Sequence, residues 1–74
     1  MTADERRLLA LLAGSADGYT VALLRAHGFT VALMVDVVRA ELATAKAERT
    51  FAAGKPVEVT RVRITDAGRR ALAR

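Results

Sequence analysis

The sequence predicts an α+β domain in which three helices are followed by a two-stranded β-hairpin and a short last helix. Apolar residues recur at helical spacing as far as Leu42. Beyond Leu42 the pattern changes to alternation with β-branched residues, interrupted by the turn-forming segment 52–56. Thr65 then provides an N-cap, and Asp66 a favourable charge, for a closing helix over Asp66–Ala73.

The size of the chain limits its organisation. With 74 residues we expect a single domain, 1–74, that buries only about 60% of its unfolded surface. The absence of cysteine excludes disulfides and thiolate metal sites. Many of the 53% hydrophobic residues are alanines, which contribute little apolar area, so we expect modest stability that a partner would supplement.

Capping residues bound the first two helices. The first helix, Ala3–Ala13, begins after Thr2, and four leucines supply its apolar face. The second helix, Val21–His27, buries one of two adjacent leucines, Leu23 or Leu24. A three-residue turn containing glycine then leads to the next helix, which is the spacing of a helix-turn-helix.

The central helix, Thr30–Leu42, is the most hydrophobic one, and we expect the other elements to pack around it. Its expected buried stripe consists of Val31, Met34 or Val35, Val38 and Leu42. Its opposite face would carry Ala32, Leu33, Asp36, Arg39 and Ala40.

The hairpin is expected from strands over Ala43–Phe51 and Val57–Ile64. In the favoured register one face is small or apolar, and the cross-strand pairs are Arg49 with Glu58, Ala45 with Val62 and Ala43 with Ile64. The other face then carries Thr44, Lys46, Arg61 and Arg63. A loop one residue longer would place Lys46 and Glu48 on the apolar face, so the first register is preferred.

Positive charge is concentrated in the second half of the chain. Three arginines face four acidic residues up to Val37, which gives −1, whereas nine basic residues face four acidic ones from Val38 onward, which gives +5. This asymmetry indicates a polyanionic partner for the basic hairpin face, with Lys55 at its turn. The alternative is a solvated hairpin whose charges prevent association between strand edges.

The segment RVRITDAGRRAL carries a family resemblance, through Thr65, Asp66, Gly68, Arg69 and Leu72. It resembles the strand-to-helix junction after the wing in MarR-like and PadR-like transcriptional regulators, which are winged helix-turn-helix proteins. VVRAELATAKAE is similar to the end of the family's recognition helix and the start of its wing, except that Glu41 stands where glycine is frequent.

The resemblance implies that the central helix enters the major groove of double-stranded DNA and that the wing reaches a neighbouring phosphate strand or minor groove. The implied groove-facing residues are Thr30, Ala32, Leu33, Asp36 and Arg39. The implied wing residues are Lys46, Arg49, Lys55, Arg61 and Arg63. The helix departs from a base-reading surface, because it offers Leu33 and an acidic Asp36 in place of amide or basic side chains. The wing is therefore the better DNA candidate.

Two functions follow as expectations. The first is a small DNA-binding transcriptional regulator. The alternative is an interaction module that forms a homodimer, or binds a protein partner, through the apolar central helix or the first helix.

Other classes of function have little support in the sequence. One histidine, an isolated Ser15 and no glycine-rich phosphate loop argue against an enzyme, a metal site or a cofactor. No stretch approaches the roughly 18 to 20 apolar residues of a membrane span, so we expect a cytoplasmic protein without a membrane partner. The segment after Arg6 and Arg7 superficially resembles a secretory signal, but Asp4 and Glu5 interrupt its basic start.

Overall fold

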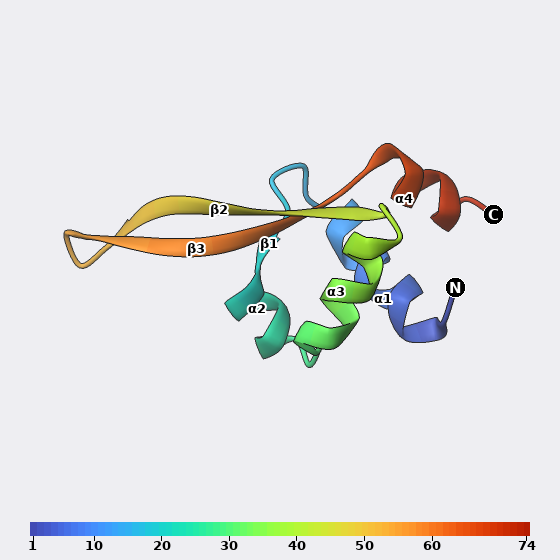
Figure 1. Ribbon diagram of the computed structural model, residues 1–74, viewed down its shortest axis with the longest axis horizontal. Coiled ribbons are helices and arrows are strands. Elements are labelled where there is room, and N and C mark those ends of the chain that lie inside the picture. Colours follow the sequence, from blue (N-terminus) through green and yellow to red (C-terminus); the bar gives the residue numbers. More distant parts are fainter.

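The computed structural model describes residues 1–74 as a small α+β domain of four helices and a three-stranded antiparallel sheet (Figure 1). Its elements are α1 (Ala3–Ala13), β1 (Tyr19–Thr20), α2 (Val21–Ala26), α3 (Val31–Arg39), β2 (Ala43–Ala52), β3 (Lys55–Ile64) and α4 (Asp66–Leu72). The strand order in the sheet is β1-β3-β2. None of the four helices has both the length and the apolar character needed to cross a membrane.

A third strand corrects the prediction of a two-stranded hairpin. Tyr19 and Thr20 pair with Val62 and Arg61 of β3, which joins the loop before α2 to the base of the hairpin. Gly18 makes this pairing possible, because its φ is 73° and its backbone lies directly against the Val62 carbonyl. Two residues are too few to produce an alternating pattern, so the strand has no signal in the sequence.

The β2–β3 hairpin has the predicted register. Arg49 lies opposite Glu58, and Ala45 lies opposite Val62. Ala53 and Gly54 form the turn with φ of 53° and 77°, the two positive values that a type I′ turn requires. We call this hairpin, residues 43–64, the arm, because Figure 1 shows its tip projecting well beyond the helices. The molecule is accordingly elongated, with extents of 44 × 22 × 20 Å.

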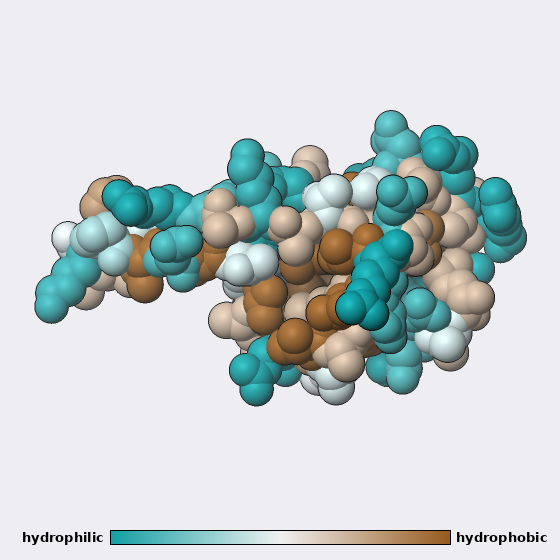
Figure 2. Space-filling view, viewed as in Figure 1, coloured by the Kyte–Doolittle hydropathy of each residue, from teal (hydrophilic) through white to brown (hydrophobic).

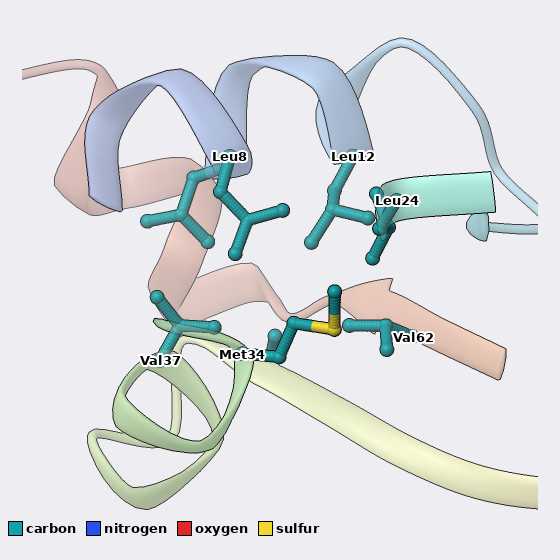
Figure 3. Packing of buried hydrophobic residues seen from close by; sticks show 8 residues of the cluster. Leu8, Leu12, Leu24, Met34, Val37 and Val62 are labelled. Atoms are coloured by element: carbon teal, nitrogen blue, oxygen red, sulfur yellow. The ribbon is translucent and has the colours of Figure 1, made fainter. Parts of the chain in front are cut away.

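The core is small and lies between α1, α3 and the base of the arm (Figure 3). Three leucines of α1 pack there against one residue of α2, two of α3 and one from each strand of the arm. The eight buried hydrophobic residues that form it are Leu8, Leu9, Leu12, Leu24, Met34, Val37, Ala43 and Val62. Leu24 is thus the buried member of the α2 pair, while Leu23 is exposed.

The predicted rotation of α3 is wrong in part. Met34 and Val37 are buried, whereas Val31 and Val35 remain 49% and 41% exposed. The α1 leucines cover the side of α3 that carries Met34 and Val37, and Val31 and Val35, on the neighbouring side, face an open groove. Since nearly every position of this helix is apolar, the period alone does not say which side is covered.

The end of α3 also differs from the prediction, because the helix stops at Arg39 instead of continuing to Leu42. Glu41 has a φ of 64° and takes the left-handed position in which glycine is usual. The amides of Glu41 and Leu42 donate to the carbonyls of Val38 and Val37, at 3.0 and 2.9 Å, which is the hydrogen-bond pattern of a Schellman motif. The Thr65 hydroxyl donates to the Glu41 carbonyl at 2.8 Å and fastens this turn to the start of α4.

We expect Glu41→Gly to raise the free energy of unfolding by about 0.5–1 kcal/mol. A left-handed conformation costs a side-chain-bearing residue about 1–2 kcal/mol, and the greater entropy of glycine in the unfolded chain offsets part of that gain. The midpoint of urea denaturation measures the change. Glu41→Ala is the control, because it keeps the strain and should stay within about 0.5 kcal/mol of the parent. A glycine variant less stable than the alanine variant would contradict this account.

Helix α4 packs beside α1 and closes the body. Gly68 is buried against the Leu42 carbonyl and the Ile64 side chain, so another backbone occupies the space that a Cβ would need. The Arg6 guanidinium donates to the Leu72 carbonyl at 3.1 Å, and that of Arg69 donates to the Ala13 carbonyl at 3.3 Å.

Candidate nucleic-acid interface

Four of the predicted wing residues lie on one side of the arm. Side chains alternate along each strand, so the residues that share a side with the buried Ala43 and Val62 form an inner face, and those between them form an outer face. The outer face carries Thr44, Lys46, Glu48, Thr50, Lys55, Val57, Val59, Arg61 and Arg63. Four cations against one carboxylate give this face a net charge of +3.

Glu48 holds the two arginines of the outer face. The Arg61 Nε donates to one carboxylate oxygen and the Arg63 Nη2 to the other, both at 2.9 Å. The arginine side chains are 26% and 35% exposed, so each guanidinium remains open to solvent. A guanidinium has five N–H donors and each spends one here, which leaves several on both arginines for an external acceptor.

The role of Glu48 was missed in the sequence analysis. In the favoured register this residue lies opposite Val59, so Arg61 is its diagonal neighbour on the same face. Diagonal neighbours lie within reach of long side chains, and this relation was the signal that could have identified the cluster.

The arginines keep Glu48 ionised. The hydrogen bonds from Arg61, and then from Arg63, lower the pKa of the Glu48 carboxyl below its ordinary value of 4.5. A depressed carboxylate pKa stabilises the folded state above the unfolded-state value and loses that contribution as the pH falls through the folded-state value.

We therefore expect Glu48→Gln to flatten the acid limb of the stability profile. The parent should lose thermal stability more steeply than the variant as the pH falls from about 5 to about 2. Circular dichroism melting across this range measures the difference. Glu58→Gln is the matched control, because Glu58 lies on the same hairpin and forms no ion pair. Parallel acid limbs in the parent and in Glu48→Gln would contradict the assigned role.

Arg49 does not belong to this cluster. It lies on the inner face opposite Glu58, and both side chains are exposed without a hydrogen bond or an ion pair to each other. The structure thus separates Arg49 from the four other cations predicted for the wing.

The predicted residues of α3 are divided between two other surfaces. Thr30, Ala32 and Asp36 line a hollow of about 200 Å³ together with Asp4 and Arg7. The Thr30 hydroxyl oxygen is used as the N-cap and accepts from the Leu33 amide at 3.1 Å. The structure brings none of these residues onto the outer face of the arm.

The other two α3 residues expected to face the DNA major groove, Leu33 and Arg39, also lie away from the outer face of the arm. Leu33 is half-buried: it packs against the core and also lines the smaller hollow with Ala32 and Asp36. Arg39 is exposed and lies at a groove between α3 and the inner face of the arm, the side opposite to Arg61 and Arg63.

This apolar groove, of about 400 Å³, is the larger of the two hollows. Figure 2 shows it as a hydrophobic depression below the base of the arm, while hydrophilic side chains follow the arm itself. Seven of its nine lining residues are hydrophobic, and the nine are Val21, Val31, Met34, Val35, Val38, Arg39, Ala45, Thr60 and Val62. Val31 and Val38 were expected in the buried stripe of α3, with Met34 or Val35 between them, and all four line this groove, so the surface was not expected from the sequence.

No three histidine, aspartate or glutamate side chains converge closely enough to hold a metal ion. Comparison of the chain with protein-family models, curated proteins and solved structures finds no match.

Proposed function

We propose that the protein is a winged helix-turn-helix domain that binds double-stranded DNA through the outer face of its arm, in a transcription-regulatory role. The observation that carries the proposal is the pair of guanidinium groups oriented by Glu48 on a projecting hairpin, with Lys46 opposite Arg61 and Lys55 farther out at the tip. The order of the elements supports the winged-helix assignment, since three helices precede the hairpin and one follows it.

The chemistry of the outer face suits phosphate. Cations that neutralise phosphates release condensed counterions, and this release provides a favourable free energy that does not depend on the base sequence. The spare N–H donors of Arg61 and Arg63 add charge-assisted hydrogen bonds to phosphate oxygens. The negative charge of Glu48 offsets one of the four positive charges. Glu48 also limits the rotamers of Arg61 and Arg63, so these two side chains lose less conformational entropy when they bind phosphate.

The helix α3 contributes little to this interaction. Its exposed side chains include Val31, Val35 and the acidic Asp36, which offer no bidentate pairing to guanine or adenine, and its one arginine, Arg39, is its last residue. The side of α3 that carries Val31 and Val35 lies at the apolar groove beside the inner face of the arm, away from Arg61 and Arg63 on the outer face. We therefore infer binding of low sequence specificity, dominated by the arm.

Titration of a fluorescently labelled duplex at two salt concentrations tests the proposal. With three to four phosphates neutralised, the affinity should fall roughly 40- to 150-fold between about 50 and about 200 mM monovalent salt. The absence of binding to any duplex at the lower salt concentration would refute the proposal.

A second candidate function is favoured by the apolar groove, which leaves α3 valines exposed beside the arm. A surface of this kind is typical of protein–protein contacts. In this second function the protein would be an interaction or dimerisation module, with its binding partner seated in the apolar groove.

A further inference from the structure

The tip of the arm is apolar on the same side as the groove. Phe51 is 71% exposed, the largest exposed fraction of any large hydrophobic residue in the chain, and it lies opposite Pro56. Both belong to the inner face, which farther along the arm forms part of the groove through Ala45 and Val62. Each molecule therefore carries an unfilled apolar groove and an apolar projection that its own groove cannot receive.

The spacing of these two features fits a reciprocal contact. Ala45 and Phe51 are six residues apart, which is about 20 Å along a strand. If two arms lie antiparallel with inner faces together, a two-fold axis near Glu48 places Phe51 of each copy over Ala45 of the other. The twist of a two-stranded ribbon allows the arms to wind around each other as they approach.

The charges of the inner face agree with this arrangement. Glu58, next to the tip, forms no ion pair within its own chain, and Arg39 at the groove forms none either. In the antiparallel arrangement Glu58 comes to lie near Thr60 of the second copy, a groove residue close to Arg39. Opposite charges thus meet at both ends of the contact. The other charge of the inner face, Arg49, lies beside the axis and opposite Glu58 of its own hairpin.

We propose that two copies of the chain form a symmetric dimer in which each inserts the Phe51 end of its arm into the apolar groove of the other. The contact is isologous, so every favourable interaction is made twice. It leaves the outer faces free, and it does not depend on the proposed DNA binding.

Sedimentation equilibrium without DNA tests the proposal with Phe51→Ser and Val35→Glu. The parent should be dimeric at concentrations well below about 1 mM. Each variant should raise the dimer dissociation constant at least about tenfold, because Phe51→Ser removes the apolar ring from both contacts and Val35→Glu puts a charge into both grooves. Phe51 is 71% and Val35 41% exposed in the monomer and neither belongs to the buried core, so circular dichroism should show an unchanged fold. Val57→Ser is the matched control, since Val57 is 40% exposed on the outer face near the tip and should not affect association.

Mixing the two variants separates arm exchange from other dimers. The Val35→Glu copy keeps an intact arm and the Phe51→Ser copy keeps an intact groove, so the mixture regains one of the two contacts. It should associate more strongly than either variant alone. A monomeric parent at about 1 mM would overturn the proposal. A Phe51→Ser variant that dimerises like the parent would overturn it in favour of direct contact between α3 helices. The same conclusion would follow if the mixture associated no more strongly than the separate variants.

Discussion

Replacing Gly18 with alanine is expected to lower the free energy of unfolding by about 1.5–4 kcal/mol. The positive φ of 73° costs an alanine about 1–2 kcal/mol, and the lower entropy of alanine in the unfolded chain reduces this cost to about 0.5–1 kcal/mol. The added Cβ would also overlap the Val62 carbonyl and meet the Arg63 side chain, and such overpacking adds about 1–3 kcal/mol. A domain of 74 residues has roughly 4–11 kcal/mol of stability in total, so the loss would bring part of the population close to unfolding.

Gly54→Ala is the control for this prediction. Gly54 has a similar φ of 77° but no neighbouring atom within 4 Å of the position of a Cβ, so only the net conformational cost of about 0.5–1 kcal/mol applies. Urea denaturation of the two variants isolates the contribution of the close approach. Equal losses in both would show that β1 does not pack against β3 as described.

The double variant Arg61→Ala/Arg63→Ala is expected to bind duplex DNA roughly 60-fold more weakly at about 0.1 M salt. Each lost phosphate contact removes a factor of about eight at this salt concentration, because log affinity changes by about 0.9 per contact for each tenfold change in salt. The slope of log affinity against log salt should become shallower by about two. The same anisotropy titration, repeated over a series of salt concentrations, measures both quantities.

Arg70→Ala/Arg74→Ala provides the matched control. It removes the same charge from exposed positions at the C-terminal end, in α4 and just beyond it, away from the arm. Its salt slope should stay within about 0.5 of the parent value. If both double variants reduced affinity and slope equally, net charge would explain the binding, and the outer face would have no special part in it.

The local features of the fold could be predicted from the sequence. Thr2, Thr20, Thr30 and Thr65 are the N-caps of the four helices, because a hydroxyl that satisfies a first-turn amide depends only on its immediate neighbours. The register of the arm followed from keeping its apolar side chains on one face, and the structure has that register.

The features that depend on distant contacts could not be predicted in the same way. The rotation of α3 is decided by the α1 leucines, which cover Met34 and Val37, and an almost uniformly apolar helix gives no indication of this. The residues proposed for DNA contact show the same division. Four wing cations share the outer face because strand alternation places them there, whereas the α3 residues lie elsewhere because the helix packs with a different side inward.

Backbone amide chemical-shift mapping with added duplex DNA tests the central proposal most directly. The account predicts that the largest shifts at low salt occur along the arm, at and beside Lys46, Lys55, Arg61 and Arg63, and that they disappear as salt is raised. Shifts concentrated on α3 with the arm unaffected, or no shifts at all, would contradict it.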